Sequence, residues 1–181
     1  GTLATEASGA DNCIAIGRDA LATQNDASAV NLAIGKAAGD AITDGSKNVL
    51  IGHQAGSALV TADESVALGY LALKAATGGH NTAIGSQALD AVVAGTHNTA
   101  VGSNAMGQAD GGESKNTAIG QAALFALNND AADNNVAIGF EAGRYHETDP
   151  SSTPGSASED GNNTGSANSI YIGYDTRASS T

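Results

Sequence analysis

The chain is poor in the residues that fill a large hydrophobic core. Its 181 residues include no Trp, four Tyr and two Phe, an aromatic share of 3%, although 41% of the residues are hydrophobic. Much of that 41% is Ala, and a methyl group contributes far less on burial than the roughly 1.5–3 kcal/mol of a large side chain. The composition therefore disfavours a compact globule and favours stacked thin layers of small residues.

Basic residues and cysteine are also scarce. Seven Lys and Arg stand against nineteen Asp and Glu, a formal net charge of −12. Phosphate binding needs clustered basic side chains, whereas these are scattered singly, so we expect no nucleic-acid partner. The lone Cys13 excludes an internal disulfide, and we interpret it as a small buried side chain. No apolar run reaches eighteen residues, so we expect no membrane insertion by this segment.

What the sequence does contain is a repeat. GGHNTAIG at 78–85 returns as GTHNTAVG at 95–102, and related phrases occur along the chain, each closed by a glycine. Successive closing glycines are 16 to 19 residues apart, with a last interval of 34. They are Gly17, Gly35, Gly52, Gly69, Gly85, Gly102, Gly120, Gly139 and Gly173. A steady period of about 17 residues is typical of a solenoid.

Two columns of mostly aliphatic residues precede these glycines. One position before the glycine stand Ile16, Ile34, Ile51, Leu68, Ile84, Val101, Ile119, Ile138 and Ile172. Three positions before it stand Ile14, Leu32, Val49, Val66, Thr82, Thr99, Thr117, Val136 and Ile170. Side chains alternate faces in an extended segment, so the two columns share one face of a short strand, which we expect to be buried. The column between them is mostly Ala, so we expect the other face to be closely covered as well.

Two further columns complete each copy. Ala recurs three residues beyond the glycine, often followed by a larger apolar residue, which predicts a second short element; a strand and a helical turn are both open, and we favour a strand. Asn recurs before the strand, at Asn31, Asn48, Asn81, Asn98, Asn116 and Asn135. Asn at the same corner of every coil can bond neighbouring backbone and stack with its counterparts. The predicted fold is an all-β, parallel β-solenoid (β-roll) of about 17-residue rungs.

The phrases NTAIGSQAL and NVAIGFEAG resemble the head repeats of YadA-like trimeric autotransporter adhesins. In period and style they are also similar to repeats of bacteriophage tail fibres and related trimeric surface fibres. The resemblance covers residues 12–142 and 168–178. It implies a homotrimer of β-rolls in which the aliphatic columns fill each roll and the Ala column faces neighbouring subunits. It also implies an extracellular location, on a bacterial surface or a virion fibre, and attachment to a cell-surface glycan or protein.

One span interrupts the repeat, and it divides the chain into rungs at 1–143, a protruding loop at 144–167, and a final rung with the C-terminal end at 168–181. The loop is polar and holds both prolines, which do not suit a central strand. It begins with Arg144, Tyr145, His146 and Glu147, our candidate binding residues. Tyr can stack on a sugar ring, while Arg and Glu can supply directional hydrogen bonds. A spacer loop that contacts only water is the alternative.

A few single features of the sequence raise the possibility of metal binding or pH sensing. His80 and His97 occupy matching positions that could bind a metal or sense pH, but the same column holds Lys and Glu, as expected of an exposed site. No Asp/Asn cluster has calcium-loop spacing, so we expect no metal and no cofactor.

No catalytic motif is visible, so we expect no enzyme. Asp63 and Glu64 leave open a glycan-depolymerising spike. Thr82, Thr99 and Thr117 leave open an ice-binding solenoid, although we expect these Thr to point inward.

Overall fold

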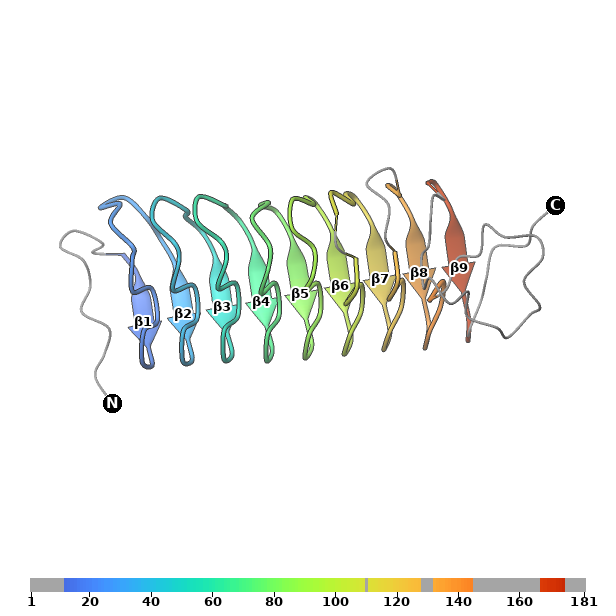
Figure 1. Ribbon diagram of the computed structural model, residues 1–181, viewed down its shortest axis with the longest axis horizontal. Helices are drawn as coiled ribbons and strands as arrows, with labels where there is room; N and C mark the ends of the chain where they lie inside the picture. The colour runs from blue at the N-terminus through green and yellow to red at the C-terminus, as the bar shows by residue number, and fades with distance from the viewer. Residues whose placement is uncertain (1–11, 110, 128–131, 145–166, 175–181) are drawn as a thin grey trace.

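The computed structural model describes residues 12–109, 111–127, 132–144 and 167–174. These residues form a parallel β-solenoid with one short strand in each coil and no helix (Figure 1). The strands are β1 (Ile14–Ile16), β2 (Leu32–Ile34), β3 (Val49–Ile51), β4 (Val66–Leu68), β5 (Thr82–Ile84), β6 (Thr99–Val101), β7 (Thr117–Ile119), β8 (Val136–Ile138) and β9 (Ile170–Ile172). The predicted all-β solenoid is therefore confirmed.

All nine strands lie in one sheet in sequence order, and every neighbouring pair is parallel. The register follows the repeat: Ile34 lies beside Ile51, Ile84 beside Val101, and Val101 beside Ile119. The residue before each closing glycine thus forms a continuous file, as predicted. β8 pairs with β9 across the 34-residue interval, so the sheet continues past the interruption.

The prediction of which face is buried was wrong. The Ala column points into the coil: Ala33, Ala67, Ala83, Ala100, Ala118 and Ala137 are fully buried. The aliphatic columns point outward; Ile84 is 36% exposed and Ile170 is 73% exposed. The interior is filled instead by large side chains from the turn segment after each glycine, including Leu73, Leu89, Met106 and Leu124. The strand position that faces these large side chains needs a small residue such as Ala, because little space is left between the two sides of the coil.

The exceptions in the Ala column support this arrangement. Leu50 stands where other coils have Ala, and here the turn segments contribute Gly39 and Gly56 in place of a large residue. A Cβ on Gly39 would lie 2.6 Å from Leu50 Cδ1, and one on Gly56 would lie 2.7 Å from Leu50 Cδ2. Tyr171 in β9 likewise faces Gly143, where a Cβ would lie 2.9 Å from Tyr171 Cδ2. Where the turn segment has a glycine, the facing strand position has a large side chain, so the interior of the coil stays filled.

The second element of each coil is neither strand nor helix, so our preference for a strand was wrong. It is a run of turns in which alternate residues have positive φ, such as Gln87 at 57° and Leu89 at 52°. The alternation points backbone N–H groups to opposite neighbours. Gln87 N–H donates to Tyr70 of the preceding coil at 2.8 Å, and Leu89 N–H donates to Ala105 of the following coil at 3.0 Å. Backbone pairing between coils is thus kept without extended geometry.

Candidate interaction surface

The outward face of the sheet repeats the same arrangement of side chains from β1 to β9. It presents the two files found in the sequence, one at each end of the three-residue strands, and all their members are partly or well exposed. The file that ends the strands is wholly aliphatic, and the file that begins them is aliphatic except for Thr82, Thr99 and Thr117. Parallel pairing in register places like residues side by side from β1 to β9. Spacings of about 4.8 Å between strands give this apolar strip a length of about 38 Å.

Two files of mostly polar side chains border the strip. The entry file, five positions before each glycine, comprises Asn12, Val30, Lys47, Glu64, His80, His97, Lys115, Asn134 and Asn168. The exit file, directly after each glycine, comprises Arg18, Lys36, His53, Tyr70, Ser86, Ser103, Gln121, Phe140 and Tyr174. All are exposed except His53, which is half-buried. The sheet face is therefore an apolar strip with polar margins.

The margins are far less acidic than the rest of the molecule. Of the six Lys and Arg in the described ranges, four lie in these files: Arg18, Lys36, Lys47 and Lys115. Of the ten Asp and Glu in the same ranges, the files hold only Glu64. The other carboxylates lie elsewhere on the coils, so an apolar contact on the sheet face would not bring many like charges together.

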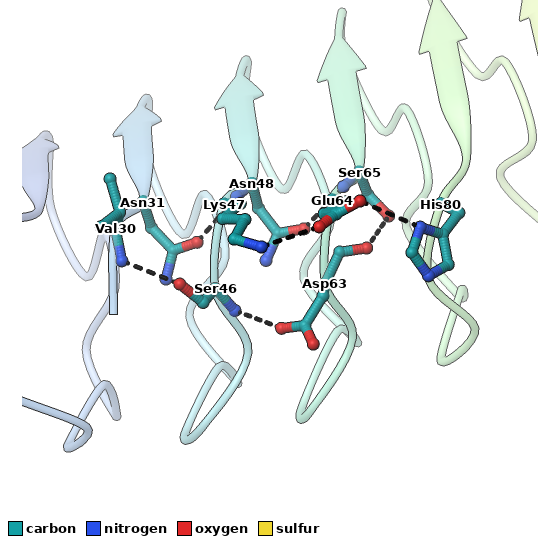
Figure 2. A network of polar contacts seen from close by, with 9 residues as sticks. All are labelled: Val30, Asn31, Ser46, Lys47, Asn48, Asp63, Glu64, Ser65 and His80. Carbon is teal, nitrogen blue, oxygen red and sulfur yellow. Dashed lines mark hydrogen bonds and ion pairs between the residues drawn. The ribbon is translucent and has the colours of Figure 1, made fainter. Parts of the chain in front are cut away.

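Side chains of the entry file contact one another from coil to coil (Figure 2). Lys47 Nζ lies 2.8 Å from Glu64 Oε1, and His80 Nδ1 lies 3.4 Å from Glu64 Oε2. The hydrogen bond and charge of Lys47 lower the pKa of Glu64, and Glu64 raises the pKa of Lys47 in return. The His80 and His97 rings stack with centroids 4.7 Å apart. The two histidines, which occupy matching positions in adjacent repeats, are therefore in contact.

The exit file gathers exposed aromatic residues. Tyr70, Phe140 and Tyr174 are the exposed Phe and Tyr of the described ranges, and all three lie in this file. Tyr70 stacks on His53 with ring centroids 5.5 Å apart. Phe140 and Tyr174 stack with centroids 5.6 Å apart and an interplanar angle of 6°. The margin is therefore ordered by ring contacts between neighbouring coils.

A buried ladder of Asn side chains holds the coils in register behind the sheet face, as predicted. In Figure 2, Asn48 N–H donates to Asn31 Oδ1 at 2.9 Å, and Ser65 N–H donates to Asn48 Oδ1 at 2.9 Å. Asn48 also donates its amide to the Ala62 carbonyl of the next coil at 2.8 Å, and Asn31, Asn81, Asn98 and Asn116 make the equivalent bond. The ladder continues through Asn81, Asn98, Asn116 and Asn135 to Ser169.

Cys13 occupies the first position of this ladder. Its Sγ accepts the Asn31 N–H at 3.3 Å and donates to the Ala29 carbonyl at 3.4 Å. The side chain is half-buried, less enclosed than the sequence reading expected. Sulfur thus takes the role that an amide has in later coils.

The predicted candidate binding residues are described only at the first position. Arg144 forms an ion pair with Glu141 and lies over the Phe125 ring at 5.3 Å, contacts that anchor it to the last described turn before the interruption. Tyr145, His146 and Glu147 lie outside the described residues, as does most of the predicted 144–167 loop.

The carboxylates considered for catalysis make structural contacts between coils. Asp63 Oδ1 accepts the Ser46 N–H at 2.7 Å, and Glu64 is engaged by Lys47 and His80 (Figure 2). Among the residues described, no group of three or more His, Cys, Asp or Glu is placed to hold a metal ion.

No family model, curated protein or solved structure matches this chain. Within the described ranges there is also no helix long and apolar enough to cross a bilayer. Sequence reasoning placed the column of His80 and His97 at an exposed site, but it missed the exit file and the arrangement of the two files as margins of one surface. Their signal was present, because residues of the entry and exit columns are aligned by the same glycines.

Proposed function

We propose that this chain is a segment of a trimeric fibre in which three copies pack their apolar strips against one another along a common axis. The observation that carries the proposal is the outward direction of both aliphatic files along nine strands. Each large aliphatic side chain removed from water contributes roughly 1.5–3 kcal/mol, so a face of this kind favours association strongly. The aliphatic face takes the role that the resemblance assigned to the Ala column.

The dimensions support this role. A strip about 38 Å long and, with its margins, about 20 Å wide has an area near the roughly 800 Å² per partner of a stable protein interface. Repetition supports it too, since copies with the same period can remain in register along the whole face. The molecule would then be a stiff rod whose acidic surface faces water.

As part of such a fibre, the segment acts as a shaft or head that mediates attachment to a cell-surface glycan or protein, without catalysis. Its location would be extracellular, on a bacterial surface or a virion fibre. The candidate contact is the interruption beginning at Arg144. Deletion of residues 145–166 should preserve the trimer and abolish binding to target cells; unchanged binding would exclude this span as the contact.

Substitutions on the strip test the proposal. The double variant Ile84→Lys with Ile119→Lys should convert the trimer into folded monomers, because it places charges in the centre of the contact. Analytical ultracentrifugation gives the mass, and circular dichroism reports whether the coil is kept. Val93→Lys is the matched control, since Val93 is 44% exposed but lies outside the sheet face. Equal masses for all three proteins would contradict the proposal.

Ice binding is a second candidate, and one observation now favours it. Thr82, Thr99 and Thr117 point outward in three adjacent strands, in register with one another, whereas the sequence reading placed them inward. Parallel pairing in register presents these hydroxyl and methyl groups at intervals of about 4.8 Å. Thermal hysteresis in solution, lost in Thr99→Lys, would favour this function; its absence would exclude it.

A further inference from the structure

The entry file and the exit file differ in chemistry, so they are not interchangeable when copies of the chain associate. The entry file holds Lys47, Glu64, His80, His97 and Lys115 near its centre. The exit file contains no carboxylate and is basic at its beginning and aromatic at its end. A contact between unlike margins would therefore have a different energy from a contact between like margins.

Closed symmetry determines which margins meet. If the copies are related by rotation about an axis parallel to the rod, no copy is displaced along the axis, so equal coils lie at equal height. The entry file of one copy then borders the exit file of the next. We infer that the entry file of one copy pairs with the exit file of the next, coil by coil, along a seam that sets Glu64 of one copy beside Tyr70 of the next. This inference rests on the proposed self-association.

The charges favour this register. It places Asn12 beside Arg18, Glu64 beside Tyr70, and Lys115 beside Gln121, and no two like formal charges meet. Tyr70 is 53% exposed and belongs to the fourth coil, as Glu64 does. A phenol hydroxyl donates to a carboxylate, and a charged acceptor makes that hydrogen bond stronger than a neutral one.

The reverse orientation is less favourable. With rods antiparallel and fully overlapped, entry files meet each other, and the third coil of one copy lies at the height of the seventh coil of the other. Lys47 would then approach Lys115, and Glu64 would have His97 rather than a phenol nearby. Two ammonium groups brought together within one partly dehydrated seam repel each other.

Disulfide trapping tests the seam directly. On a Cys13→Ser background, the double variant Glu64→Cys with Tyr70→Cys is oxidised gently and run on a non-reducing denaturing gel. The two positions are six residues apart in extended chain, about 15–20 Å, too far for a disulfide within one copy. The seam predicts bands of two and three linked chains, with most of the protein in covalent trimers, because each of three seams carries one link.

The control pair is Glu64→Cys with Lys74→Cys, since Lys74 is exposed but belongs to neither file. It should remain monomeric on the same gel. Mixed assemblies of the two single variants should give only pairs that contain one chain of each. Trimers in solution without the Glu64–Tyr70 link would overturn the seam and leave the proposed function intact. Monomers in solution would overturn both.

Discussion

The side-chain oxygen of Asn81 accepts the backbone N–H of Asn98 at 2.9 Å, one coil further along the rod. Asn98 repeats the relationship with the N–H of Asn116 at 3.0 Å and donates its amide to the Glu113 carbonyl at 2.7 Å. Because Asn98 is 1% exposed, water cannot replace these partners. The ladder thus satisfies buried backbone groups that the short strands leave unpaired.

Removal of one ladder amide should destabilise the coil. Asn98→Ala leaves a buried N–H and a buried carbonyl without their partners, and we expect a loss of about 2–4 kcal/mol in the free energy of unfolding. Asn98→Ser should recover part of it, since Ser65 holds a ladder position naturally. Urea denaturation measures both; Asn25→Ala, at an exposed position, is the control. Equal midpoints for Asn98→Ala and Asn25→Ala would contradict the role of the ladder.

The closing glycines should not tolerate a side chain. A Cβ on Gly52 would lie 2.2 Å from the Gly69 carbonyl oxygen, and the backbone there has a φ of 141°. Both features oppose Ala, so Gly52→Ala is expected to lose about 3 kcal/mol or more, in the range of severe single substitutions. Gly107→Ala is the milder comparison because its nearest contact is 3.2 Å. Thermal unfolding followed by circular dichroism should separate the two variants clearly.

Neighbouring residues of β6 should respond in opposite ways to added volume. Ala100 is fully buried, so Ala100→Leu overfills the coil, and we expect a loss of about 1–3 kcal/mol. Val101 points outward, and Val101→Leu should change the free energy of unfolding of the single coil by less than about 0.5 kcal/mol. Both are measured in the monomeric Ile84→Lys with Ile119→Lys background, which removes any contribution of association. The reverse ranking would place the strip inside the coil.

The carboxyl of Asp40 should destabilise the fold at neutral pH. Burial raises its pKa, and nearby Asp19 adds to the rise; its Oδ1 is buried with no hydrogen-bond partner in the described part of the chain. A carboxyl with a higher pKa when folded favours folding at low pH, and this contribution is lost as pH rises through that pKa. Asp40→Asn should therefore stabilise the protein at pH 7 by at most about 1 kcal/mol.

The same substitution should have no stabilising effect below about pH 3, where both states are protonated. Asp44→Asn, at an exposed position, serves as the control at each pH. Urea midpoints across the range give the comparison. A benefit of Asp40→Asn that persists unchanged into acid would show that packing, not charge, is responsible.

Much of the fold could be predicted from the sequence because the repeat period of a solenoid determines which residues of neighbouring coils lie side by side. The glycine spacing located the strands, and the recurring Asn predicted the ladder from Asn31 to Asn135. Periodicity states which residues share a face, however, and not which face is inward. Both faces of these strands carry apolar residues, Ala on one and larger aliphatic residues on the other. The more hydrophobic face was expected inside the coil, but it is the outer one.

A cue to the correct side was nevertheless present. Leu50 and Tyr171 replace Ala in the same or the next coil as Gly39, Gly56 and Gly143, which replace large turn residues. Such compensation indicates that the two columns face each other. The polar margins were harder to predict. Lys47, Glu64 and His80 share a column of the sequence repeat but differ in type, and the contacts of Glu64 with Lys47 and His80 show that members of this column touch one another.

The central claim is that the outward aliphatic strip is a contact between copies of the chain. Native mass spectrometry of the unmodified protein at micromolar concentration tests it most directly. The account predicts a single species with three times the 17.6 kDa mass of one chain, stable to dilution. A species of one chain mass at every concentration would contradict it.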